Sequence, residues 1–90
     1  MRVRFFAAAA AAAGTTEVEV GLADIEHDGG TLGSLLDHLP QVVPGGTSGP
    51  PLQRVVSRSS FLVNETGARD RDRRLAEQDT IDILPPFAGG

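Results

Sequence analysis

Residues 79–90 read DTIDILPPFAGG, and this stretch is the most informative one for the fold. Polar and apolar side chains alternate over residues 80–84, which is the pattern of a β-strand with Ile81 and Ile83 facing the core. Two prolines follow at once, and proline has a fixed φ and no backbone N–H to offer a neighbouring strand. The pattern therefore predicts a final strand that ends abruptly at a proline pair.

The four residues after Pro86 are Phe87, Ala88, Gly89 and Gly90. Because the two prolines cannot extend a strand ladder or a helix, we expect this tail to stand away from the folded domain. Fully extended, its four residues span at most about 14 Å. Glycine has no Cβ, so the last two residues can pass through a narrow channel in another protein and present the terminal carboxylate there. A frayed glycine tail, or a remnant of cloning, is the alternative interpretation.

A second alternating segment opens the chain. Residues 2–6 read RVRFF, which predicts a strand with Val3 and Phe5 on the core face. The alanine run Ala7–Ala13 favours a short helix that ends at Gly14. A short secretory signal is the alternative for this region. The alternating arginines, and the absence of Leu, Ile and Val from the alanine run, favour the strand and the helix.

The most regular helical pattern lies in the middle of the chain. Thr31 is a favourable N-cap, and Pro40 predicts the end of the helix. Between them, four leucines recur at the i, i+3, i+4 and i+7 spacing of one apolar face, namely Leu32, Leu35, Leu36 and Leu39. We therefore expect one main helix here, packed on the sheet by this face.

Shorter segments complete the expected elements. Residues 16–20 alternate and predict a strand antiparallel to the first one. Residues 61–63 predict a third strand, which ends in a turn at 64–67. The Pro- and Gly-rich residues 44–51 predict a surface loop, and apolar residues at 52–56 predict a short helix after it.

Length and composition limit the classes of protein. Ninety residues are enough for one domain, which we place at residues 1–86, with the extended tail at 87–90. The order strand, strand, helix, strand, strand predicts an α+β fold of two layers. Eight Arg against twelve Asp and Glu give a net charge of −4, which disfavours non-specific binding to nucleic acid. With no Cys and no apolar run long enough to span a membrane, we expect a cytoplasmic protein without thiol-based sites.

Two charged segments are weighed as ligand sites. His27 lies among the carboxylates of Asp24, Glu26 and Asp28, but one His in an acidic loop is more often a solvated turn, so we expect no metal. Residues 69–74 contain four Arg and two Asp, a local charge of +2. They predict a salt-bridged loop rather than a contact with nucleic acid.

Several segments together identify a family that the chain resembles. They are Phe5-Phe6-Ala7 with Gly14 after it, Thr31 at the start of the Leu-rich helix, Val63-Asn64 at the end of the third strand, and the closing residues 79–90. On these segments the chain resembles the ubiquitin-like sulfur carriers, and among them the small subunit of molybdopterin synthase. The resemblance covers essentially the whole chain, and the closing stretch is its most specific part.

This resemblance implies a β-grasp fold, in which one main helix covers a mixed sheet, with short extra helices and a flexible C-terminal tail. It also implies that a ubiquitin-activating-like adenylyltransferase adenylates the Gly90 carboxylate with Mg-ATP. A sulfurtransferase would then supply the sulfur of a C-terminal thiocarboxylate. The large subunit of molybdopterin synthase would take up Phe87, Ala88 and Gly89 and receive the sulfur for the dithiolene. The chain itself would be non-catalytic and would bind no cofactor.

A partner interface is expected beside the tail. By strand alternation, Phe6 and Leu84 point away from the core. If the first and last strands are adjacent, these side chains form one exposed patch, to which Leu62, Pro85 and Pro86 contribute. Large apolar side chains that face outward are typical of a binding surface. The alternative is that the alanine helix or a loop covers this second face of the sheet.

Three other functions stay open. A sister carrier would supply sulfur to the thiazole of thiamine or to cysteine biosynthesis. A ubiquitin-like modifier would be attached to lysines of other proteins; the chain has no Lys of its own on which to build branched chains. A plain interaction module with an accidental glycine tail is the third.

Overall fold

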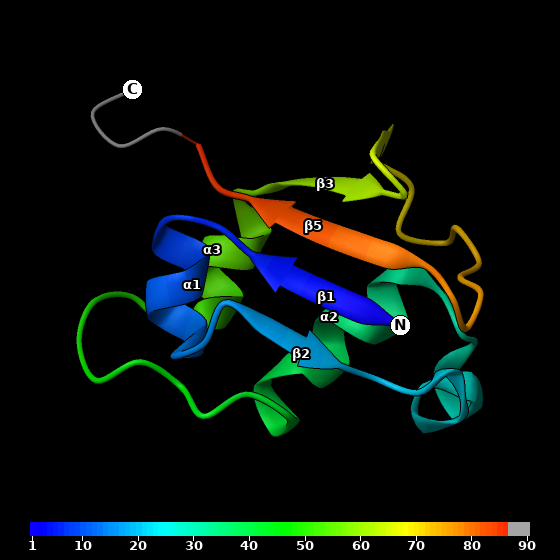
Figure 1. Cartoon of the computed structure of the whole chain (residues 1–90), viewed down its shortest axis with the longest axis horizontal. Coiled ribbons are helices and arrows are strands. Elements are labelled where there is room, and N and C mark those ends of the chain that lie inside the picture. Colours follow the sequence, from blue (N-terminus) through cyan, green and yellow to red (C-terminus); the bar gives the residue numbers. More distant parts are fainter. Residues whose placement is uncertain (87–90) are drawn as a thin grey trace.

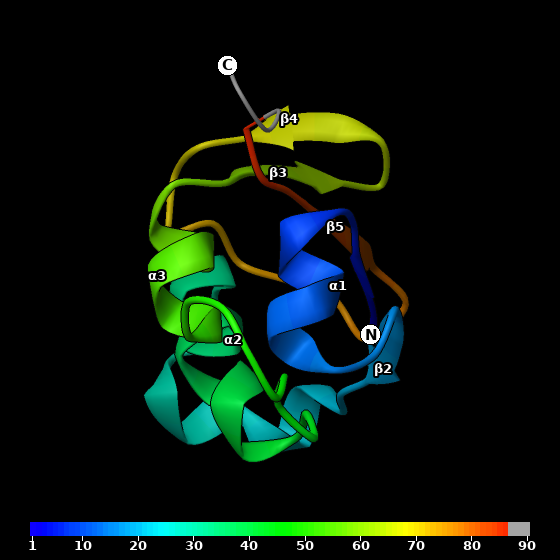
Figure 2. The same ribbon diagram turned by 90° about the vertical axis from the view of Figure 1, so that its left-hand side faces the viewer.

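The computed structural model describes residues 1–86, which form a five-stranded mixed sheet with its helices on one face (Figures 1 and 2). The strands are β1 (Arg2–Phe5), β2 (Glu17–Glu19), β3 (Ser60–Val63), β4 (Thr66–Ala68) and β5 (Thr80–Leu84). The α-helices are α1 (Ala8–Ala13), α2 (Leu32–His38) and α3 (Leu52–Ser57). Three 3₁₀ turns lie between them, η1 (Leu22–Asp24), η2 (Glu26–Asp28) and η3 (Leu39–Gln41). The α+β fold of two layers is confirmed.

The first and last strands lie side by side at the centre of the sheet, whose order is β2-β1-β5-β3-β4 (Figure 1). β1 and β5 run parallel, with Val3 opposite Ile81 and Phe5 opposite Ile83. All four side chains are buried in the core. The strands predicted at both ends of the chain, and the core faces assigned to them, are confirmed.

α2 supplies most of the helical layer. The Ser34 N–H donates to Thr31 Oγ1 at 3.1 Å and the Thr31 N–H donates to Ser34 Oγ at 3.2 Å, a reciprocal cap that starts the helix at the predicted residue. The α-helix ends at His38, and Pro40 lies in the 3₁₀ turn that follows. At seven residues α2 is the longest helix, and no helix of residues 1–86 has the length and apolar content that crossing a membrane requires. Its core residues, each no more than 1% exposed, are Leu32, Leu35, Leu36 and Leu39, the last of them in η3.

α1 is held at its end by the Pro- and Gly-rich loop. The helix stops at Gly14, whose φ of 76° lies in the left-handed region that glycine adopts easily. The N–H groups of Gly45 and Gly46 donate to the carbonyls of Ala13 and Ala12 at 2.8 and 2.9 Å. The loop thus provides partners for carbonyls that the end of a helix leaves free.

β4 is the strand that the sequence pattern did not predict. Asn64 and Glu65 both have positive φ, 52° and 69°, as the type I′ two-residue hairpin turn requires. Thr66 therefore already pairs with Val63, and the turn is shorter than predicted. β4 has only three residues, and Gly67 in its middle removes any alternation that a pattern could reveal.

Candidate functional site

The last strand, β5, lies at the centre of the sheet. β5 finishes at Leu84, and the Phe6 N–H donates to the Ile83 carbonyl at 3.2 Å, which joins the end of β1 to the end of β5. Beyond it, Pro85 is half-buried and Pro86 is exposed. The predicted reactive terminus and tail lie outside the described residues; they are Phe87, Ala88, Gly89 and Gly90.

One face of the sheet carries the residues predicted as a partner interface. The register places Arg4, Asp82 and Leu62 abreast on it. Leu84 lies on the same face, two residues further along β5, and Phe6 lies just beyond the end of β1, beside it. Phe6 remains 40% exposed, whereas Leu62 and Leu84 are half-buried. We call this the open face.

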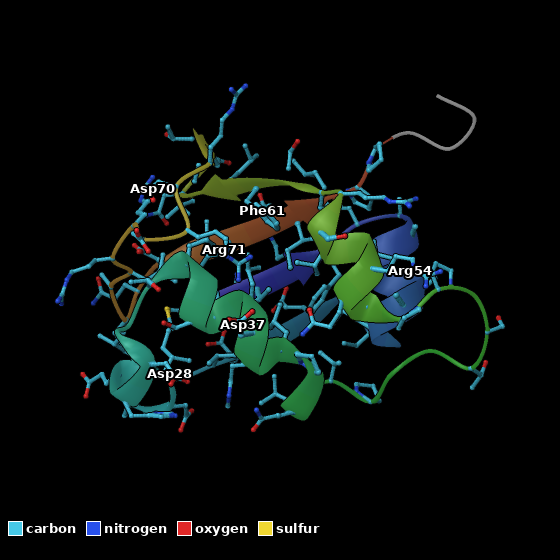
Figure 3. The ribbon with its side chains drawn as sticks, turned by 180° about the vertical axis from the view of Figure 1, so that it is seen from behind. Asp28, Asp37, Arg54, Phe61, Asp70 and Arg71 are labelled. Atoms are coloured by element: carbon cyan, nitrogen blue, oxygen red, sulfur yellow. The ribbon has the colours of Figure 1, made fainter. Side chains whose placement is uncertain are left out.

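The helices lie on the other side of the sheet. α1 and α3 contact each other, and α2 lies on the same side as both (Figure 2). Seen from behind, the helices stand in front of the sheet (Figure 3). The alternative in which the alanine helix covers the open face is therefore wrong.

Arg4 and Asp82 form the polar centre of the open face. Arg4 Nε lies 2.6 Å from Asp82 Oδ1 and Nη2 lies 2.8 Å from Oδ2, so one guanidinium binds both carboxylate oxygens. These hydrogen bonds, together with the attraction of the Asp82 charge, raise the pKa of Arg4 above its ordinary value. Arg4 Cζ also lies 5.9 Å from the centre of the Phe6 ring, within the range of a cation–π contact.

The centre of the open face carries a paired charge. Asp82 is only 4% exposed, and its charge is already matched by Arg4. The open face therefore has no unmatched charge at its centre, and the apolar side chains of Phe6, Leu62 and Leu84 lie around that centre.

The two segments weighed as ligand sites lie elsewhere. His27 Nε2 is 3.2 Å from Asp28 Oδ2, and both side chains are exposed. Within residues 1–86, no group of three or more His, Cys, Asp or Glu side chains is placed to hold a metal ion. In the loop at 69–74, Arg71 Nη2 lies 2.9 Å from Asp37 Oδ1, so the loop is held to α2 by an ion pair.

Comparison with known proteins gives one family, and two crystal structures are among the similar solved structures. The ThiS family model matches residues 3–90. The crystal structure of SAMP1 from Haloferax volcanii is similar with a TM-score of 0.66 and 26% identity, over 100% of this chain and 98% of that one.

A crystal structure of H. volcanii small archaeal modifier protein 1 is similar with a TM-score of 0.65 and 24% identity, over 97% of each chain. No curated protein sequence matches the chain. The agreement in fold over the full length of both chains confirms the expected β-grasp architecture.

Proposed function

Because the chain belongs to the ThiS family of ubiquitin-like sulfur carriers, we propose that its Gly90 carboxylate carries sulfur for a biosynthetic reaction. The observation that carries the proposal is a family match that runs to residue 90 and so includes the closing diglycine. The position of β5 supports it, because this strand runs through the buried centre of the sheet and ends at Leu84, directly before Pro85 and Pro86. Chemistry at the chain end therefore requires no change in the core.

Sulfur loading takes two steps. In a ubiquitin-activating-like adenylyltransferase, a Gly90 carboxylate oxygen attacks the α-phosphorus of ATP, pyrophosphate leaves, and an acyl adenylate forms. Hydrosulfide delivered by a sulfurtransferase then attacks the acyl carbon, and AMP leaves with one of the original carboxylate oxygens. A thiocarboxylate remains. Mg²⁺ and ATP are bound by the activating enzyme, and this chain is its substrate rather than an enzyme.

The open face is the proposed contact with the activating enzyme. The exposed Phe6 and the half-buried Leu84 lie beside the point where the tail begins, and large apolar side chains that reach the surface are typical of interfaces. Pro85 and Pro86 have fixed φ angles, so they restrict the direction in which the tail starts. A partner that covers the open face is therefore well placed to receive the chain end.

We propose the dithiolene of molybdopterin as the destination of the sulfur. The thiocarboxylate sulfur would displace an oxygen substituent from a side-chain carbon of a pyranopterin precursor held by a large synthase subunit. Water would then hydrolyse the resulting thioester, which leaves the sulfur on the precursor as a thiolate and returns the Gly90 carboxylate. Two loaded chains would supply the two sulfurs of the dithiolene. Support comes from residues 79–90, which resemble the end of the small subunit of molybdopterin synthase. Reconstitution with the precursor and a candidate large subunit tests this destination. Sulfur transfer into a thiazole or into cysteine instead would assign the chain to a sister pathway.

Intact mass spectrometry tests the carrier function itself. After co-expression with an activating enzyme and a sulfurtransferase, we expect one oxygen at Gly90 to be replaced by sulfur. Deletion of Gly90 should abolish the exchange and leave the melting temperature unchanged. A terminus that stays a free acid with every activating enzyme tried would contradict the proposal, and a large loss of stability on deletion would mean that the tail is structural.

A ubiquitin-like protein modifier is the second candidate. The likeness to SAMP1 at 26% identity favours it, since that protein is named as a small archaeal modifier. The same adenylate serves both functions, because a lysine amine can attack the acyl carbon in place of hydrosulfide and release AMP. Isopeptide adducts of this chain on other proteins, found by mass spectrometry of digested lysate, would favour the modifier.

A further inference from the structure

A cavity of about 380 Å³ lies beside the root of the tail. Figure 3 shows Arg54 on α3, at the end of the molecule where β5 finishes. Asp70 and Arg71 lie toward the opposite end. Residues of α3, of the Pro- and Gly-rich loop and of the chain end line this cavity, among them Pro50, Arg54, Val55, Arg58, Pro85 and Pro86.

This cavity carries positive charge in an acidic protein. The sequence contains no Asp or Glu between Asp37 and Glu65, and its cations there are Arg54 and Arg58. Among residues 1–86, neither guanidinium has a carboxylate oxygen within 4.0 Å. The chain as a whole has a net charge of −4, and the positive loop at 69–74 contains Asp70 and Asp72, whereas the sequence around Arg54 and Arg58 is free of acidic residues.

The two arginines are neighbours along one side of a helix. Arg54 lies in α3 and Arg58 is its C-cap residue, four positions later. Like charges at this spacing repel each other and destabilise the free helix slightly. A carboxylate placed between them removes the repulsion, and a guanidinium fork can bind both of its oxygens. The pair is therefore suited to an acidic group that comes from outside the described fold.

We propose that this cavity receives an Asp or Glu side chain of the protein that takes up the chain end, an inference that rests on the proposed function. The four residues after Pro86 can span at most about 14 Å. A protein that draws Gly90 into its active site must therefore bring its surface close to Pro86, and so to Arg54 and Arg58, which line the same cavity. The arginine pair then steers acidic partners toward the tail and fixes their orientation.

A protein carboxylate fits this position better than the phosphates of the nucleotide. The adenylate forms at Gly90, at the far end of the tail, whereas Arg54 in α3 and its C-cap residue Arg58 line the same cavity as Pro86, where the tail begins. The remaining walls of the cavity, such as Val55 and Pro85, are apolar and strengthen an ion pair by limiting its exposure to water.

Matched charge reversals test the inference. Adenylation is measured by ATP–pyrophosphate exchange with the adenylyltransferase that charges the wild-type chain. We compare R54E/R58E with R73E/R74E, whose arginines are exposed, lie in the loop at 69–74 and form no ion pair among residues 1–86. Each exchange of Arg for Glu removes two positive units, so both double variants change the net charge from −4 to −8.

We expect R54E/R58E to raise KM for the carrier about tenfold with kcat unchanged, and R73E/R74E to stay within about twofold of wild type. The KM of R54K/R58K should lie between those of the wild type and R54E/R58E, because Lys keeps the positive charge but lacks the forked guanidinium that binds both carboxylate oxygens. Added salt should raise KM of the wild type more than that of R54E/R58E. Unchanged melting temperatures would show that the variants are folded.

Three outcomes overturn the inference. Equal KM values for R54E/R58E and R73E/R74E would show that only the total charge of the protein matters. The proposed function would still stand in that case, because the wild type would be adenylated. A saturable shift of the Arg54 and Arg58 side-chain NMR signals with inorganic phosphate, in the absence of any partner, would make the cavity a site for small anions. If no enzyme adenylates the wild type, both the proposed function and this inference fail.

Discussion

Arg4 on β1 and Asp82 on β5 hold each other across the parallel centre of the sheet, with both carboxylate oxygens bound by one guanidinium. The pair lies on the open face, directly opposite the core face of the same two strands. A slip of one residue between the strands would separate the pair and turn Ile81 and Ile83 outward. The ion pair and the apolar core therefore select the same register.

The first prediction concerns pH. Arg4→Gln should lower the free energy of unfolding by an amount that is constant from neutral into alkaline solution. Because the fold raises the pKa of Arg4, the contribution of its charge is fully present below the ordinary arginine pKa and is lost only above the raised one. Denaturant unfolding of both proteins at several pH values measures the difference. A difference that shrinks between about pH 7 and about pH 10 would mean that another group is responsible.

The second prediction concerns the open face. Phe6→Ala should raise KM for adenylation about tenfold or more, because a buried aromatic anchor contributes about 2 kcal/mol or more to an interface. Val42→Ala is the matched control: Val42 is 38% exposed against 40% for Phe6, but it follows η3 and is not on the open face. Equal kinetics for the two variants would exclude Phe6 from the contact.

The third prediction concerns the loop anchored on α1. An ideal Cβ on Gly46 would overlap the Ala11 carbonyl oxygen, so Gly46→Ala must push the loop away from the helix. We expect a loss of about 1–3 kcal/mol in the free energy of unfolding. Gly67→Ala serves as the control, since nothing lies within 4 Å of its Cβ position, and it should change stability by less than about 0.5 kcal/mol. Chemical denaturation distinguishes the two.

The fourth prediction concerns the start of α2. Thr31→Ala removes the hydroxyl that accepts the Ser34 N–H and should cost about 1 kcal/mol of stability. Thr47→Ala, in the exposed part of the loop, should be neutral within about 0.5 kcal/mol. If thermal unfolding shows the same midpoint for both variants, the cap does not hold the helix.

The parts of the fold that sequence could predict are those with a local period. Alternation at both ends of the chain and the leucine spacing after Thr31 each reflect contact with the core, so the pattern alone identifies strand, helix and buried face. β4 has three residues and no such period, and its existence depends on the positive φ of Asn64 and Glu65, which no pattern reveals.

The candidate site was harder to predict because it depends on long-range register. Alternation places Asp82 outward, but its bonds to Arg4 join residues 78 positions apart and require that β1 and β5 pair in parallel without a shift. The position of Arg54 and Arg58 beside Pro85 likewise follows from how α3 packs, although the short helix itself was predicted. An acid-free stretch of sequence around two arginines was the available signal.

The central position of β5 also determines how the protein would respond to traction on its C-terminus. A strand with one neighbour at the rim of a sheet can be peeled off bond by bond, but β5 is bonded along its length to β1 on one side and β3 on the other. A pull along the strand axis puts the hydrogen bonds to β1 and the hydrogen bonds to β3 under shear at the same time. An enzyme that tugs on the chain end should therefore meet a mechanically resistant anchor.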